Sequence, residues 1–171
     1  MTLAIVVTCA VAASAAEWKE LKSPEGGFSV QFPGTPQKLK PQVEKATGKV
    51  TSSTWVLELD KGNTAYTAMF TDLPASLQLG DPQAGLTAGR DLAIKDQKGK
   101  LVFDRKIAIG SYPGREFAFT WNNAGEEATS HFQAVFVKRR LLQLVVVCHA
   151  ASPVDEKDLR KFFDSFVLLK E

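Results

Sequence analysis

The sequence has 171 residues, of which 44% are hydrophobic and 23% are charged, so it is long enough for one domain with a sizeable core. Its 21 basic and 19 acidic residues leave a net charge of +2, which argues against the strongly basic class of nucleic-acid-binding proteins. The two basic clusters, Lys138-Arg139-Arg140 and Arg105-Lys106, are typical of solvated hairpin tips rather than of a phosphate-binding face.

The N-terminal segment, residues 1–16, differs from the rest because it carries no charged side chain. It contains an apolar and small-residue run from Leu3 to Ala13, followed by the A-x-A type of motif that a signal peptidase recognises. We therefore expect a signal peptide over 1–16, cleavage near Ala16 and an extracytoplasmic (periplasmic or secreted) domain over 17–171. The segment lacks the basic start of a signal peptide, so the true start codon can also lie upstream of Met1.

The two cysteines differ in their expected fate. Cys9 leaves with the signal peptide, so Cys148 stands alone and no intramolecular disulfide is expected. A lipoprotein attached through Cys9 is the less favoured alternative, because the preceding Val6-Val7-Thr8 lacks the usual Leu and small residue. The apolar run is also shorter than the approximately 20 residues that span a bilayer, so no transmembrane segment is expected.

The first half of the domain contains alternating patterns typical of half-buried strands. Residues 28–32 predict a strand with Phe28, Val30 and Phe32 facing the core. Residues 48–59 and 64–71 predict a hairpin around the turn at 60–63. Its inward-facing side chains are expected to include Trp55, Leu57, Leu59, Tyr66, Ala68 and Phe70.

A helix is predicted from Asp81 to about Lys98. Asp81 is a capping residue, Pro82 suits the first helical position, and Gly99 is a typical stop. The helix is expected to bury a face made of Leu86, Gly89, Leu92 and Ala93.

Four consecutive strands are predicted over 101–109, 114–121, 129–138 and 141–149. Their short connections indicate antiparallel neighbours, because parallel strands need long crossovers. If Phe119 lies opposite Phe132, and if Arg139-Arg140 forms the next turn, then His131 lies opposite Cys148. The fourth strand is apolar on both faces apart from Gln143, so the sheet is expected to be covered on both sides.

A second helix is predicted to start at Ser152-Pro153, with Asp155 in its first turn. A stripe of Leu159, Phe162, Phe163 and Phe166 follows at helical spacing, so this helix is expected to be a main cover for the sheet. Residues 167–169 add a short final strand. These elements predict an α+β fold in which an antiparallel sheet is covered by helices on both faces.

The sequence contains none of the strong catalytic motifs: no nucleophile elbow, no phosphate-binding glycine loop and no pair of cysteines at metal spacing. His131 and Cys148, opposite each other in the expected register, are the one combination that suggests half of a metal site or a thiolate–imidazole pair. The simpler interpretation is that Cys148 is a small buried hydrophobe, because no third ligand is placed. No cofactor and no catalytic residue are predicted.

The most distinctive local string is Tyr112-Pro113-Gly114-Arg115-Glu116. Its Tyr112, Arg115 and Glu116 form a candidate surface for a ligand or partner, since aromatic and arginine side chains dominate many interfaces. The structural interpretation, a Pro-Gly turn with Tyr112 over it and Arg115 and Glu116 paired with neighbours, is the one that we favour.

Three strings carry a resemblance to a known family: Phe-Ser-Val-Gln-Phe-Pro-Gly-Thr-Pro at 28–36, Gly-Ser-Tyr-Pro-Gly-Arg-Glu at 110–116 and Phe-Phe-Asp-Ser-Phe-Val-Leu at 162–168. With them the chain resembles small secreted or lipoprotein-borne bacterial domains of unknown function, which are similar in layout to PsbP, the extrinsic subunit of the photosynthetic oxygen-evolving complex. The resemblance spans about residues 17–170 and implies an α/β/α sandwich with a non-enzymatic binding or accessory role. No motif allows functional or metal-binding residues of PsbP to be carried over, and fold alone does not give function.

We therefore expect a secreted, non-enzymatic binding or accessory domain whose partner is an unknown protein or a component of the cell envelope. The alternative is a small metal- or ligand-binding protein, or an enzyme, that uses His131 and Cys148. A third hypothesis is a purely structural component of the envelope.

Overall fold

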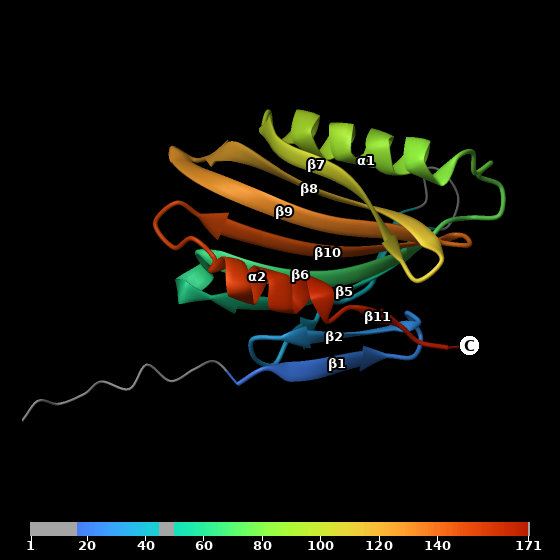
Figure 1. Ribbon diagram of the computed structural model, residues 1–171, viewed down its shortest axis with the longest axis horizontal. Helices are drawn as coiled ribbons and strands as arrows, with labels where there is room; N and C mark the ends of the chain where they lie inside the picture. Colours follow the sequence, from blue (N-terminus) through green and yellow to red (C-terminus); the bar gives the residue numbers. More distant parts are fainter. Residues whose placement is uncertain (1–16, 45–49, 171) are drawn as a thin grey trace, which may run out of the picture.

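An eight-stranded antiparallel sheet forms the centre of the protein in the computed structural model, which describes residues 17–44 and 50–170 (Figure 1). The strand order is β3 (Gln37–Lys38), β5 (Val50–Leu59), β6 (Thr64–Asp72), β10 (Arg140–His149), β9 (Glu126–Val137), β8 (Tyr112–Asn123) and β7 (Lys100–Ile109), with β4 (Gln42–Glu44) also paired to β5. The expected signal peptide over 1–16 lies outside the described residues.

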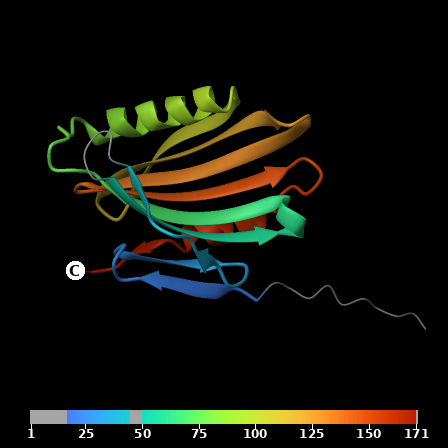
Figure 2. The same cartoon turned by 180° about the vertical axis from the view of Figure 1, so that it is seen from behind.

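A second, three-stranded sheet lies against one face of the first. It contains β1 (Lys19–Ser23), β2 (Phe28–Phe32) and β11 (Val167–Leu168), with β2 in the middle. Helix α2 (Glu156–Asp164) lies beside this small sheet on the same face (Figure 1). Helix α1 (Pro82–Asp96) lies on the opposite face, along β8 and β9 (Figure 2).

The core lies between the two sheets and α2, and it is aromatic. The ring of Phe162 in α2 meets Phe32 of β2 and Tyr66 of β6 edge to face, with centroids 5.1 Å apart in both pairs. Each phenylalanine buried in this way contributes about 1.5–3 kcal/mol of transfer free energy. The aromatic stripe predicted from Leu159 to Phe166 therefore joins both sheets rather than one.

The expectation of helices on both faces needs correction. One face is covered mainly by the small sheet, with α2 beside it, so the layers are not those of a simple α/β/α sandwich. The physical reason is size: α2 has nine residues and is about 14 Å long, far less than a sheet of eight strands spaced about 4.8 Å apart. The α+β class itself is correct.

Several local predictions are confirmed. Phe28, Val30 and Phe32 are fully buried, and β5 pairs with β6 as an antiparallel hairpin. Asp81 caps α1 by accepting hydrogen bonds from the backbone N–H groups of Gln83 and Ala84. These features depend on short-range patterns, which determine local structure most directly.

The predicted strand pairing of the meander is wrong by two residues. The β9–β10 turn is Lys138-Arg139, so Arg140 already pairs with Val137 and belongs to β10. Independently, the β8–β9 turn is Ala124-Gly125, so Phe132 lies opposite Phe117 rather than Phe119. The face of each side chain is unchanged, because only a shift by an odd number of residues turns a strand over.

Two other boundaries differ from the prediction. Residues 122–128, expected as a connection, are almost entirely strand, because Ala124 and Gly125 adopt left-handed φ angles of 53° and 101° and make a tight two-residue turn. Helix α2 starts at Glu156 rather than at 152–153, and Asp155 is its cap. In α1, Leu92 is 58% exposed and does not belong to the buried face.

Candidate functional site

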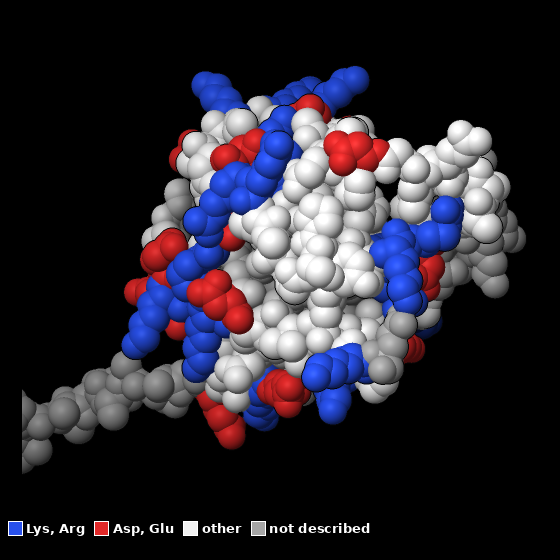
Figure 3. All heavy atoms as spheres, turned by 45° about the vertical axis from the view of Figure 1, so that its right-hand side comes forward, with Lys and Arg blue, Asp and Glu red and all other residues white. Residues whose placement is uncertain are grey.

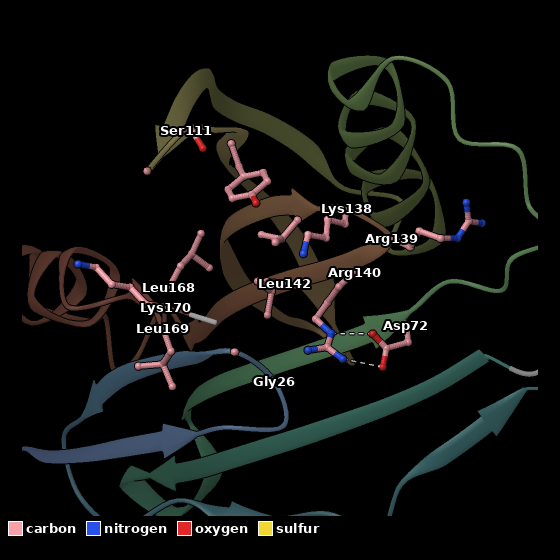
Figure 4. Close-up of a pocket in the computed structure, with 14 residues that line it drawn as sticks. Gly26, Asp72, Ser111, Lys138, Arg139, Arg140, Leu142, Leu168, Leu169 and Lys170 are labelled. Carbon is pink, nitrogen blue, oxygen red and sulfur yellow. Dashed lines mark hydrogen bonds and ion pairs between the residues drawn. The ribbon is translucent and has the colours of Figure 1, made fainter.

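A hollow of about 930 Å³ opens at one end of the large sheet (Figure 4). Four segments that are distant in the sequence surround it: the β1–β2 turn, the β7–β8 turn, the β9–β10 turn and the segment after β11. All four lie at the right-hand end of the molecule in Figure 1. The hollow is therefore a product of tertiary structure rather than of one loop.

Tight turns define the rim of this hollow. Gly27, Gly110 and Lys138 all adopt left-handed backbone conformations, with φ angles of 73°, 60° and 55°. Gly adopts such angles without strain, whereas Lys does so at some energetic cost. Because the β7–β8 and β9–β10 turns contain only two residues each, the strands end abruptly and leave space beyond them.

The lining of the hollow is predominantly basic. It contains Lys138, Arg139, Arg140 and Lys170 but only one acidic side chain, Asp72. Figure 4 shows Lys138 pointing into the hollow and Arg139 pointing away from it. A concentration of positive charge in a concave site favours an anionic ligand, because surrounding protein strengthens the field there.

Arg140 is held in a fixed position at the edge of the hollow. Its Nε and Nη2 donate to the two carboxylate oxygens of Asp72 at 2.6 and 2.9 Å, and its Nη1 donates to the Glu25 carbonyl at 2.7 Å. The guanidinium also lies 4.5 Å from the centre of the Phe70 ring. This arrangement joins β6, β10 and the β1–β2 turn, so the wall of the hollow is pre-organised.

Apart from Ser111, the remaining lining is apolar or aromatic, with Tyr112 from β8, Leu142 from β10 and Leu168 from β11. Leu142 is almost completely buried, and Tyr112 and Leu168 pack against the core. Apolar walls with a few fixed polar groups are the usual composition of a ligand site.

The structure separates the three site residues expected from the sequence. Tyr112 lines the hollow, whereas Arg115 and Glu116 are only 7% and 4% exposed and point to opposite faces of β8. Arg115 lies on the face covered by α1, and Glu116 lies on the face covered by α2. The three side chains do not form one surface.

Arg115 belongs to an internal ion cluster under α1. Its Nε and Nη2 donate to Asp104 at 2.6 and 2.5 Å, and its Nη1 donates to Thr87 of α1 at 2.8 Å. Arg90 of α1 donates to the same carboxylate. Hydrogen bonds and positive charge from Arg115, together with Arg90, hold the pKa of Asp104 below its ordinary value of 3.8.

Glu116 belongs to a second internal cluster on the other face. Its carboxylate accepts hydrogen bonds from Arg105 of β7 at 2.9 Å and from Arg160 of α2 at 2.8 Å. His131 lies nearby in β9, and burial lowers the pKa of its imidazole below the ordinary 6.5. Glu116 therefore connects α2 to the edge of the sheet.

The expected pairing of His131 with Cys148 is wrong. His131 lies opposite Val146, and Cys148 lies opposite Thr129, as a result of the two-residue shift in register. Within residues 17–44 and 50–170, no group of three or more His, Cys, Asp or Glu side chains could hold a metal ion. Cys148 is buried and forms no disulfide within the described residues.

Sequence reasoning missed the contribution of Lys138 and Arg140, which it took for a solvated hairpin tip. A partial signal was present, because the basic residues stand directly at a predicted turn. What the sequence does not contain is the proximity of Gly26, Ser111 and Leu169, which come from three other parts of the chain.

The fold is similar to two solved structures. The solution structure of cyanobacterial PsbP (CyanoP) from Synechocystis sp. PCC 6803 aligns with a TM-score of 0.57 and 10% identity, covering 95% of this chain and 98% of that one. A crystal structure from Bacteroides thetaiotaomicron aligns with a TM-score of 0.52 and 14% identity, covering 90% of this chain and 49% of that one. The chain thus has a PsbP-like fold, as the resemblance in sequence strings implied.

Comparisons by sequence add nothing to this result, since no family model and no curated protein matches the chain. Among the described residues, no helix is both long and apolar enough to cross a membrane. Any statement about function must therefore come from the site itself.

Proposed function

We propose that this protein is an extracytoplasmic, non-enzymatic binding domain that holds an anionic group of its partner in the hollow at the end of the sheet. The single observation that carries the proposal is the lining of that hollow, which includes four basic residues and one acidic residue around an apolar floor, with the side chain of Arg139 pointing away. Its volume of about 930 Å³ lies within the usual range of ligand sites, about 300–1,000 Å³.

The arrangement suits recognition of an anion with an apolar body. The ammonium of Lys138 supplies a point charge, while Arg140, fixed by Asp72, offers a rigid planar edge. Tyr112 and Leu168 present apolar surface to the rest of the bound group. Among the residues expected from the sequence, Tyr112 keeps a direct role, and Arg115 and Glu116 support it by fixing β8 against the two helices.

The chemistry of the lining favours binding over catalysis. The described lining contains no His, Cys or Glu, and its one carboxylate, Asp72, is occupied by Arg140. Ser111 therefore has no His or free carboxylate beside it in the described lining to act as its general base. The extracytoplasmic location rests on the composition of residues 1–16.

The test is thermal unfolding of the protein with inorganic phosphate, sulfate or citrate as simple anionic probes. A probe at 100 times its dissociation constant adds about 2.7 kcal/mol, which raises the midpoint by about 5–10 °C for a domain of this size. Lys138→Glu should remove most of this shift. Lys157→Glu, which makes the same charge change on an exposed residue of α2, should leave it intact.

Two results would contradict the proposal. One is the absence of any anion-dependent shift in the unmodified protein. The other is an equal shift in Lys138→Glu and Lys157→Glu, which would mean that anions act on overall charge rather than in the hollow.

A further inference from the structure

Residues 73–80, which follow β6, are unusual because they expose leucines and carry no charged side chain; the next residue is the exposed Asp81, which caps α1. All six residues from Ala75 to Gly80 are exposed and uncharged. Leu77 and Leu79 are 44% and 40% exposed, although large apolar side chains elsewhere in β6 and at the start of α1 are buried or partly buried. Exposed leucines side by side on a projecting segment commonly mark a surface that meets an apolar environment.

Arg139 fixes this leucine loop, residues 73–80, to the β9–β10 turn. Its Nη2 donates to the Leu77 carbonyl at 2.6 Å and to the Pro74 carbonyl. The backbone N–H of Leu73 donates to the Arg139 carbonyl at 2.9 Å, and that of Leu77 donates to the Pro74 carbonyl at 3.1 Å. These hydrogen bonds tie the loop to the β9–β10 turn, and Leu77 and Leu79 remain exposed to solvent.

The leucine loop and the basic hollow share one end of the molecule. Arg139 joins them directly, since it belongs to the lining of the hollow and binds the loop carbonyls. Figure 3 turns this end partly toward the reader and shows an uncharged area bordered by Lys and Arg side chains, with some Asp and Glu among them. Apolar projections and positive charge therefore lie on the same side of the protein.

We propose that this end docks on the surface of a lipid bilayer that contains anionic lipids. Leu77 and Leu79 enter the boundary between headgroups and acyl chains, while Lys138 and Lys170 lie at the level of the phosphates. The inference deepens the proposed function and rests on it, because the anionic group held in the hollow is then a lipid headgroup.

Charge and polarity favour a bilayer over a folded protein as the occupant. Surface-binding proteins combine inserted apolar residues with basic side chains, each basic residue contributing about a fivefold gain in affinity for an anionic membrane. A protein interface of comparable strength usually centres on aromatic anchors in a groove, whereas the leucine loop projects and contains no aromatic residue. Two projecting leucines can insert into a lipid bilayer without a shaped pocket, whereas a folded protein partner would need a groove that fits them.

The experiment is co-sedimentation of the full chain with vesicles of phosphatidylcholine alone and with vesicles of one part phosphatidylglycerol to two parts phosphatidylcholine. The apolar residues 1–16 are present in every variant, so differences between variants report on the described end. We expect tighter binding to the anionic vesicles and a loss of that gain in high salt.

Two pairs of variants separate the contributions of the exposed leucines and of Lys138 to vesicle binding. Leu77→Ser with Leu79→Ser should weaken binding to anionic vesicles about tenfold. The matched pair Leu92→Ser with Leu101→Ser, at leucines 58% and 48% exposed on α1 and β7, should leave it unchanged. Lys138→Glu should weaken binding about tenfold, and Lys157→Glu should have little effect.

The outcomes distinguish this inference from the function on which it rests. If phosphate shifts the unfolding midpoint through Lys138 but anionic vesicles bind no better than neutral ones, the hollow binds a soluble anion and membrane docking is wrong. If the two leucine pairs weaken vesicle binding equally, docking through residues 73–80 is also wrong. If neither phosphate nor anionic vesicles depend on Lys138, both proposals fail.

Discussion

Charged side chains gather in two regions of this protein, and the two regions use them differently. In the first half of β8, beside β7, Arg115 and Glu116 are almost fully buried, and each has fixed partners of opposite charge. At the end of the sheet, four basic residues surround a hollow that contains one carboxylate. In the first region each of these buried charges has a partner of opposite charge, whereas the lining of the second contains more basic than acidic residues.

The difference shows why residue type alone is a poor guide to a binding surface. Tyr112, Arg115 and Glu116 stand within five positions of one another, yet only Tyr112 reaches the hollow. A buried ion pair is costly to break, because the remaining charge has lost its compensation. Mutations should therefore lower stability in the first region and affinity in the second.

The largest effect is expected for Arg115→Met. The substitution removes the main partner of Asp104, whose side chain is only 17% exposed, and also the bond to Thr87 of α1. The free energy of unfolding should fall by about 3–5 kcal/mol in urea denaturation. Arg105→Met, at a side chain that is more than half exposed, should cost less than about 1 kcal/mol. Equal losses of unfolding free energy in the two variants would mean that the ion pair of Arg115 with Asp104 is not effectively buried.

Glu116→Gln should have an intermediate effect. The amide keeps the shape of the side chain but removes the charge that Arg105 and Arg160 share, and Arg160 connects α2 to the sheet. We expect a loss of about 1–3 kcal/mol, measured by the same denaturation. Glu127→Gln, at an exposed position in β9, is the control and should be neutral.

Lowering the pH should reduce the stability of the folded protein by protonating Asp104 in the cluster of Arg115. Because the pKa of Asp104 in the folded protein lies below 3.8, its ionised form stabilises the fold above that pH. This contribution disappears as the pH falls from about 4 through the folded pKa, since the unfolded chain takes up the proton first. Unfolding measured between pH 5 and pH 2 should show a steeper loss in the unmodified protein than in Arg115→Met. Parallel curves would contradict the assignment.

The smallest effect on stability is expected for Lys138→Glu. Lys138 stands at a turn with a left-handed backbone, and the substitution changes charge without changing that requirement. Stability should stay within about 0.5 kcal/mol of the unmodified protein, while phosphate binding is lost. A large loss of stability would show that Lys138, like Arg115 and Glu116, mainly stabilises the fold, and would contradict its assignment to the binding site.

Much of the fold follows from local pattern, and the exceptions have physical causes. The alternation at Phe28, Val30 and Phe32 and the cap at Asp81 predict their elements correctly, because each depends on a few neighbouring residues. The register of β9 and β10 depends on whether Lys138 accepts a left-handed conformation, which its residue type does not suggest. That one turn moved His131 away from its expected position opposite Cys148.

The candidate site was only partly predictable, since its walls come from segments more than 100 residues apart. Gly26 and Leu169 meet there because β11 pairs with β2, a contact between the two ends of the domain. The string around Tyr112 marked one wall, and the basic run at 138–140 marked another, but nothing in the sequence placed them together. Tertiary contacts determine such a site, and local composition does not.

The central claim is that the end of the sheet binds an anion while the buried clusters do not. Its most direct test is titration of the isotopically labelled protein with inorganic phosphate, followed by NMR of the backbone amides. We predict that the largest shifts occur at Gly27, Ser111, Tyr112 and Lys138, and that the amides of Arg115 and Glu116 barely move. Shifts centred on Arg115 and Glu116, or none at the hollow at saturating phosphate, would contradict the account.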